Sequence, residues 1–357
     1  MKAYQPVPSR SAMAIRYAFM NLTASCAACA MLTGKLRLHV SPDRLLFLTL
    51  LFNLIAVCGR LLTSLFADRV QDKHTGVRMA VMVFSLGILW PVEFGITLKV
   101  ILAAVGTCLL HAFTVSSLLA RSDYRAESIG LYAAGGAIGI AFARYAGLLG
   151  YLAVGFLMIF ACPSDKSERL PDAAEKRLPK APPTPLAPLF VLALLTVIAG
   201  GSYLFGSLSF SWDSGFHTHM MHIAFAIAIG RFLGGWLADR IGTATTVVGG
   251  LVGGTMLLLY AADNKLLALA GLILLSFAAA PTVMLVFRLM PSHPGFIGAL
   301  ASAAAYLGMQ TVKLYPMKAA HFALFPLVTA VVTVGVSLSL FFLSRRSSPN
   351  KEVMPDA

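Results

Sequence analysis

Charged residues are scarce in this sequence, and the scarcity excludes most soluble folds. Asp, Glu, Lys and Arg make up 12% of the 357 residues, whereas a soluble domain carries about 25%. With 58% hydrophobic residues, the chain has too little polar surface to enclose its apolar residues in water. Disordered, collagen-like and disulfide-stapled chains have other compositions. We therefore expect an all-α, polytopic membrane protein, since apolar stretches of about 20 residues form spanning helices.

Motifs for several kinds of chemistry are also missing. The sequence has no Gly-x-x-x-x-Gly-Lys-Ser/Thr loop, so ATP-driven transport has no support. We find no catalytic dyad or triad and expect neither an enzyme nor a cofactor. The cysteines lie in or beside apolar stretches and are interpreted as packing residues rather than a disulfide framework; they are Cys26, Cys29, Cys58, Cys108 and Cys162.

What the sequence does contain is a series of apolar stretches, interpreted as twelve spans. They fall near 12–33, 44–66, 77–92, 96–119, 128–143, 145–161, 187–210, 216–238, 244–262, 265–287, 294–314 and 320–343. The polar, proline-rich stretch 163–188 is typical of a cytoplasmic linker. It divides the chain into two six-helix bundles, 1–162 and 189–344, followed by a tail, 345–357.

Two of these assignments leave alternatives open. The fifth and sixth stretches are short and have Arg144 in their turn, so a re-entrant pair is the alternative to two full crossings. The apolar part of the first stretch follows Lys2, Arg10 and Arg16, and this order resembles a signal peptide. We interpret it as a transmembrane helix because its apolar part is long.

The basic residues indicate the orientation. The net charge is +13, which in a soluble protein would suggest nucleic-acid binding. Here Lys and Arg lie in short loops, 20 of the 28 on one face and 8 on the other when the twelve spans are threaded. This asymmetry places both termini in the cytoplasm and the protein in the cell (inner) membrane. We expect no nucleic-acid partner.

An internal repeat is the strongest pattern in the sequence. Residues 59–69 read GRLLTSLFADR and residues 230–240 read GRFLGGWLADR, at a constant offset of 171. Each copy ends the second span of its half. A weaker echo pairs Ile129-Gly130 with Ile297-Gly298. Two parallel repeats, related by an axis along the membrane normal, produce such a pattern.

The segment 235–242, GWLADRIG, resembles the signature of the major facilitator superfamily of transporters. The first copy departs from the signature, with Ser64 in place of a glycine and no glycine after Arg69. More loosely, 106–139 resembles the fosmidomycin-resistance-type exporters. The resemblance implies a secondary transporter and a gating role for the residues of the motif, which are Gly59, Arg60, Asp68, Arg69, Gly230, Arg231, Gly235, Asp239, Arg240 and Gly242.

The aspartates of the repeat also have a physical interpretation. A carboxylate at the cytoplasmic mouth can accept hydrogen bonds from the N-terminus of a neighbouring helix and pair with a guanidinium. Arg60 and Arg231 lie about two turns before the aspartates and are expected to snorkel toward the interface. The alternative is that the Asp-Arg pairs only anchor the topology.

Polar residues deep in spans mark candidates for the substrate or proton path. His111 is the first, because histidine changes charge near neutral pH; a structural hydrogen bond between helices is the alternative. Further candidates are Asn21, Asn53, Gln310, Asp213 and His222. Asp213, His219 and His222 have spacing that permits metal binding, but we expect no metal site.

These patterns together predict a monomeric secondary transporter that works by alternating access in the lipid bilayer. Its partners would be a small-molecule substrate and protons, and the exporter resemblance favours efflux. An uptake carrier or a facilitator is the alternative within this class. A membrane sensor or an intramembrane enzyme is the alternative of another class.

Overall fold

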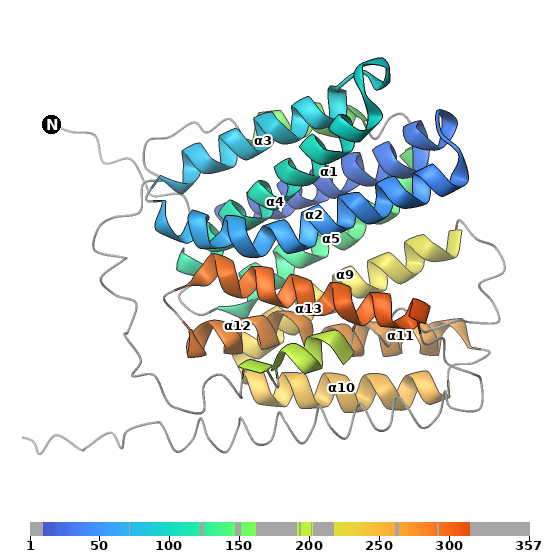
Figure 1. The fold of residues 1–357 in the computed structure, drawn as a ribbon. Helices are drawn as coiled ribbons and strands as arrows, with labels where there is room; N and C mark the ends of the chain where they lie inside the picture. The colour runs from blue at the N-terminus through green and yellow to red at the C-terminus, as the bar shows by residue number, and fades with distance from the viewer. Residues whose placement is uncertain are drawn as a thin grey trace, which may run out of the picture.

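The fold is given by a computed structural model, in which every regular element of the described residues is helical (Figure 1). The described residues are 10–70, 72–121, 125–146, 151–161, 191–192, 194–200, 202, 218–260, 264–290 and 293–314. The prediction of an all-α chain is confirmed for this part. The predicted linker, the span 320–343 and the tail lie outside it.

The helices of the first part follow the predicted apolar stretches. α1 continues into one π-helical and one 3-10 turn, from Met31 to Leu38, before the chain turns. Pro42 begins α2 at a position where its missing N–H costs nothing. The bounds are α1 Arg10–Ala30, α2 Pro42–Arg69, α3 Lys73–Leu89, α4 Ile96–Arg121, α5 Ala126–Ala146 and α6 Leu152–Ala161.

The helices of the second part match the later stretches. The stretch predicted at 187–210 is helical at 191–192 and 194–200. The stretch 265–287 is interrupted by a short turn, which separates α11 from α12. The bounds are α9 Thr218–Ile241, α10 Thr243–Leu259, α11 Lys265–Ser276, α12 Ala279–Leu289 and α13 Pro294–Leu314.

Six helical segments in the described residues are long and apolar enough to cross a bilayer. Large apolar side chains such as Leu62, Met82 and Leu266 are exposed on the outside of the helices, which water would oppose and lipid favours. These features are those of an integral membrane protein. The prediction of twelve spans includes shorter helices and residues outside the described part, and it stays a prediction.

Glycines allow several helices to pack closely. A Cβ on Gly135 or Gly139 of α5 would meet the carbonyl groups of Ala18 and Leu22 in α1. A Cβ on Gly230 or Gly234 of α9 would likewise meet the backbone of α11 and the residue after it. The small-xxx-small spacing seen in the sequence thus corresponds to direct backbone contact between helices.

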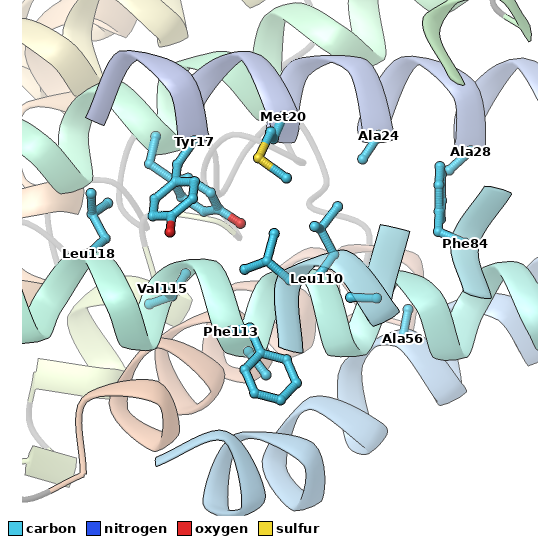
Figure 2. Packing of buried hydrophobic residues seen from close by; sticks show 14 of the residues in the cluster. Tyr17, Met20, Ala24, Ala28, Ala56, Phe84, Leu110, Phe113, Val115 and Leu118 are labelled. Carbon is cyan, nitrogen blue, oxygen red and sulfur yellow. The ribbon is translucent and has the colours of Figure 1, made fainter. Parts of the chain in front are cut away.

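The largest apolar cluster lies between α1 and α4 and extends to α2 and α3. Figure 2 shows Tyr17, Met20 and Ala24 on the side of α1 that faces Leu110 and Leu118 of α4. The Met20 side chain is fully buried. This packing fixes the position of α4, which carries His111.

Two further contacts join segments far apart in the sequence. α5 packs against α9, and α13 packs against α2 and α4. In Figure 1, α1 to α5 lie in the upper part of the view and α9 to α13 in the lower part, so these pairs lie where the two groups meet. Both aspartates of the sequence repeat lie in these contacts.

Candidate functional site

Asp68, near the end of α2, binds the first turn of α13. Its Oδ1 accepts a hydrogen bond from the backbone N–H of Gly295 at 2.7 Å, and its Oδ2 accepts one from Phe296 at 3.1 Å. The hydroxyl of Ser116, which is fully buried in α4, donates a third to Oδ1 at 2.7 Å. Lys73 Nζ in turn donates to Ser116 Oγ at 2.7 Å. Three helices therefore meet at this carboxylate, and α3 joins the network through Lys73 and Ser116.

Asp239, near the end of α9, binds the first turn of α5 in the same way. Its Oδ1 accepts from the N–H of Ala126 at 2.8 Å, and its Oδ2 accepts from Glu127 at 2.9 Å. Unlike Asp68, Asp239 is exposed. Among the described residues, neither aspartate pairs with a guanidinium group. The predicted hydrogen bonds to a helix N-terminus are present, and the predicted ion pair is not found there.

The first turn of a helix suits a carboxylate because its N–H groups have no partner within the helix and carry partial positive charge. The two contacts differ by one residue in register. The first residue of α13 is Pro294, which has no N–H to donate. Asp68 therefore binds the second and third residues of its helix, whereas Asp239 binds the first and second.

Two glycines permit these approaches. A Cβ on Gly295 would meet the Asp68 carboxylate, and a Cβ on Gly235 would meet the backbone of Ala126 and Glu127. Gly59 of the motif faces Cys108 of α4. The motif glycines Gly59, Gly230 and Gly235 are therefore contact points between helices, which explains their residue type without a ligand.

The arginines of the motif behave differently from one another. Arg69 and Arg240 are exposed, and the Arg240 guanidinium lies 4.0 Å from the centre of the Trp236 ring. Arg231 points to the middle of α5, where its Nη1 donates to the carbonyl of Ala133 at 3.1 Å. Arg60 has a buried Nε with no hydrogen-bond partner in the described part of the chain. The prediction that Arg60 and Arg231 snorkel is wrong, since neighbouring helices enclose both groups.

His111 lies at the centre of a hydrogen-bonded cluster. Its Nδ1 is 3.1 Å from the hydroxyl of Tyr132 in α5, and its Nε2 is 3.0 Å from the hydroxyl of Ser302 in α13. The Tyr132 hydroxyl is also 3.1 Å from that of Thr114. Arg60 interacts electrostatically with both His111 and Tyr132. The cluster thus draws side chains from α2, α4, α5 and α13.

The other predicted path residues lie apart from His111 or bind it indirectly. The Nδ2 of Asn21 donates to the backbone carbonyl of Tyr132 at 2.9 Å and so joins α1 to α5. Asn53 and Gln310 are partly buried in α2 and α13. His222 is exposed in α9, and Asp213 lies outside the described residues. No group of three metal-ligating side chains occurs among the described residues, which exclude Asp213.

Five side chains of these contacts are not among the site residues that the sequence predicts: Lys73, Thr114, Ser116, Tyr132 and Ser302. Serine, threonine and tyrosine are common in membrane helices and carry no charge signal. Lys73 is one of many loop cations. Tyr132 lies two residues after the Ile129-Gly130 echo and within the exporter-like stretch 106–139, and these patterns alone point to it.

Comparison with solved structures shows a fold similar to that of major facilitator superfamily transporters. The structure of the transporter FucP in the outward conformation aligns with a TM-score of 0.65 and 13% identity, over 94% of this chain and 99% of that one. A single-residue variant of the E. coli fucose:proton symporter FucP aligns with a TM-score of 0.59 and 14% identity, over 92% and 97% of the two chains. No protein-family profile and no curated protein match the sequence.

Proposed function

We propose that the protein is a secondary transporter that moves a small solute by alternating access. Its two halves are 1–162 and 189–344, each with six spans, joined by the linker 163–188 and followed by the tail 345–357. The substrate would bind between the halves. The sequence repeat and the similarity of fold to FucP support this division.

The observation that carries the proposal is the pair of aspartate contacts. With the division above, Asp68 joins the first half to α13 of the second, and Asp239 joins the second half to α5 of the first. Residues near the end of α4 and the start of α5 take part in the two contacts, so both lie at the same end of the helices. Two such contacts at one end can hold that end closed and break when the halves rock.

The same end is the one predicted to face the cytoplasm, because it carries most of the loop Lys and Arg residues. In the state closed there, the solute site would be accessible from the opposite side. The FucP structure that aligns over most of this chain is itself in an outward conformation. The preference for efflux over uptake rests on the exporter resemblance and stays a prediction.

Proton coupling is the third part of the proposal, with His111 as the carrier. The residue links α4 to α5 and α13 through Tyr132 and Ser302, so it lies where the two halves meet. Histidine is the side chain that gains or loses a proton closest to neutral pH. Protonation would exchange an acceptor for a donor at one of these contacts. The fold neighbour named as a fucose:proton symporter supports coupling of this kind.

Counterflow in proteoliposomes tests the proposal. The vesicles are loaded with one member of a library of unlabelled sugars, organic acids and amino acids, and uptake of the labelled compound is followed. We expect counterflow with one class of compound, loss of it in Asp239→Asn, and normal membrane abundance of that variant. Arg78→Gln, an exposed change on α3, is the control. Absence of counterflow for the whole library with folded protein would contradict transport.

A further inference from the structure

The charges inside the helices have one sign. Every acidic residue in the described α-helices lies within three residues of a helix end: Asp43, Asp68, Glu127 and Asp239. Arg60, by contrast, lies 18 residues after the start of α2 and 9 before its end. At 1.5 Å per residue it is about 13 Å from the nearer end. No acidic side chain of these helices lies at its depth.

Arg60 faces protein rather than lipid. Its electrostatic partners are Cys108 and His111 on α4 and Tyr132 on α5. Its side chain as a whole is partly exposed, whereas its Nε is buried and has no hydrogen-bond partner among the described residues. A buried guanidinium group is costly unless an anion or several acceptors satisfy it. Within the described part of the chain, the Nε–H of Arg60 is therefore a buried donor without an acceptor.

The other copy of the repeat is the internal control. Arg231 occupies the equivalent position, 171 residues later, and donates to the Ala133 carbonyl at 3.1 Å. Its role as a link between α9 and α5 is accounted for by that bond. No equivalent backbone bond is found for Arg60 in the described part of the chain, although the two arginines lie at similar depths in their helices. The two copies therefore differ in that the arginine near His111, Arg60, is the one without such a bond.

An imidazole and a phenol group are among the neighbours of this donor, since Arg60 interacts electrostatically with His111 and Tyr132. Tyr132, Thr114 and Ser302 form a chain of short polar contacts through His111. Each of these groups can either donate or accept a hydrogen bond. In a ligand with a carboxylate next to a hydroxyl or carbonyl group, the carboxylate could pair with Arg60. The hydroxyl or carbonyl group could hydrogen-bond to the uncharged groups of this cluster.

We propose that Arg60 binds the carboxylate of a small organic monoanion, which is the transported solute. This inference rests on the proposed function and specifies its substrate class. The planar guanidinium group fits a carboxylate through two parallel hydrogen bonds. The single positive charge of Arg60 balances one negative charge, whereas the second charge of a dianion would find no cation on Arg60. Arg60 thereby selects carboxylates over neutral solutes of equal size.

Ligand-dependent thermal unfolding of the full chain in lipid nanodiscs tests the inference. The probes are short-chain hydroxy- and keto-monocarboxylates, each paired with the primary amide of the same carbon skeleton. A ligand that binds only the folded state raises the unfolding temperature with its concentration. We expect carboxylates to stabilise the wild type and their amides to have no effect. Arg60→Gln should weaken binding of the same carboxylate at least tenfold.

Two variants separate a lost contact from a lost fold. Arg60→Lys keeps the charge but not the two-pronged geometry, and we expect it to bind the carboxylate several times more weakly than the wild type. Arg78→Gln removes an exposed positive charge from α3 and should bind normally. If Arg60→Gln does not fold, the affinities of the wild type and Arg60→Lys for the carboxylate are compared instead. Equal binding by these two proteins would overturn the role of Arg60.

Counterflow with the same pairs distinguishes the two proposals. Carboxylates that both stabilise the protein and exchange across the membrane support both. Neutral amides or sugars that exchange, with no dependence on Arg60, overturn the anion site and leave transport standing. Carboxylates that bind through Arg60 without any exchange support the site and contradict transport. A panel in which no carboxylate stabilises the folded wild type overturns the anion site.

Discussion

The two copies of the repeat make the same contact with different supports. In both, an aspartate at the end of a helix accepts hydrogen bonds from the first turn of a distant helix. Asp68 is partly buried and has a third donor, Ser116, which is itself bound by Lys73. Asp239 is exposed and, within the described part of the chain, has the two backbone donors alone. Both contacts depend on the attraction between a carboxylate and a helix N-terminus. The contact of Asp68 has, in addition, a network of side-chain hydrogen bonds.

The loops that follow the aspartates explain the difference. In the second copy, Gly242 has a positive φ of 101° and turns the chain directly into α10. The first copy has no glycine there, and its longer loop ends with Asp72 as the N-cap of α3. That loop places Lys73 in the first turn of α3, within reach of Ser116. Loss of the glycine thus accompanies the gain of the network.

The largest expected effect is on amide hydrogen exchange at the two contacts, when Asp68→Asn is compared with Asp239→Asn. A hydrogen bond to a charged group is worth about 1.5–3 kcal/mol, and about 1.4 kcal/mol corresponds to a factor of ten. We expect hydrogen exchange of the Gly295 and Phe296 amides to rise about 100-fold in the first variant. Exchange at Ala126 and Glu127 should rise about 10-fold in the second. Mass spectrometry of overlapping peptides gives both values.

The next effect isolates the network. Ser116→Ala removes one donor from Asp68 and the acceptor of Lys73 but leaves both backbone bonds in place. We expect about 10-fold faster exchange at Gly295 and no change at Ala126. Combined with Asp68→Asn, the change should be less than additive, because the two residues share one interaction.

Ser117→Ala is the matched control for that experiment. Ser117 is the neighbouring buried serine, and its hydroxyl donates to the Phe113 carbonyl within α4. Its removal should leave exchange at Gly295 unchanged. If both serine variants have the same effect, the network contributes no more than general packing of α4, and the two aspartate contacts are equivalent.

The sequence predicts one part of this site well and another part poorly. The offset of 171 residues, the helix ends and the acceptance of helix N–H groups by the aspartates follow from local pattern and helix electrostatics. The partners Ser116, Tyr132 and Ser302 do not, because hydroxyl residues in apolar helices carry no distinctive signal. Which of them meet depends on how α4, α5 and α13 pack.

The arginines illustrate the same limit. Their depth in the sequence predicts snorkelling, since a long cationic side chain on an isolated helix extends to the interface. Arg231 instead donates to the Ala133 carbonyl, and Arg60 faces His111 and Tyr132. At that depth, neighbouring helices supply a backbone acceptor for Arg231 and polar neighbours, but no hydrogen bond to Nε among the described residues, for Arg60. The sequence gives the depth of an arginine within its helix, but only the packing of the helices determines which groups lie beside it.

A smaller effect is expected for the glycine that distinguishes the two loops. Gly242→Ala forces a side chain into a left-handed conformation and should destabilise the protein by about 1 kcal/mol, although the added Cβ would meet no neighbour within 4 Å. Gly249→Ala, at an equally open position inside α10, should stabilise by about 0.5–1 kcal/mol. Unfolding in one detergent measures both. Changes of the same sign would contradict the conformational role of Gly242.

The smallest effect concerns Asp72, the N-cap residue of α3, whereas the N-cap of α10 is Gly242. Hydrogen bonds from the Thr75 hydroxyl, at 2.7 Å, and from the Thr75 N–H, at 3.2 Å, lower the pKa of Asp72 below its ordinary value of 3.8. Because the pKa is depressed in the folded state, this cap contributes stability above about pH 4 and loses it as the pH falls through the folded pKa. Carbon NMR of labelled aspartate carboxyls measures that pKa.

Thr75→Ala provides the decisive variant for this cap. Without the hydroxyl, the pKa of Asp72 should rise toward 3.8, and the start of α3 should loosen at a higher pH than in the wild type. The start of α10 has Gly242 and no titratable cap, so its exchange should show no step in the same pH range. An unchanged pKa in Thr75→Ala would mean that the backbone alone sets it. The two loops would then still differ in their response to acid, but the Thr75 hydroxyl would contribute nothing to that difference.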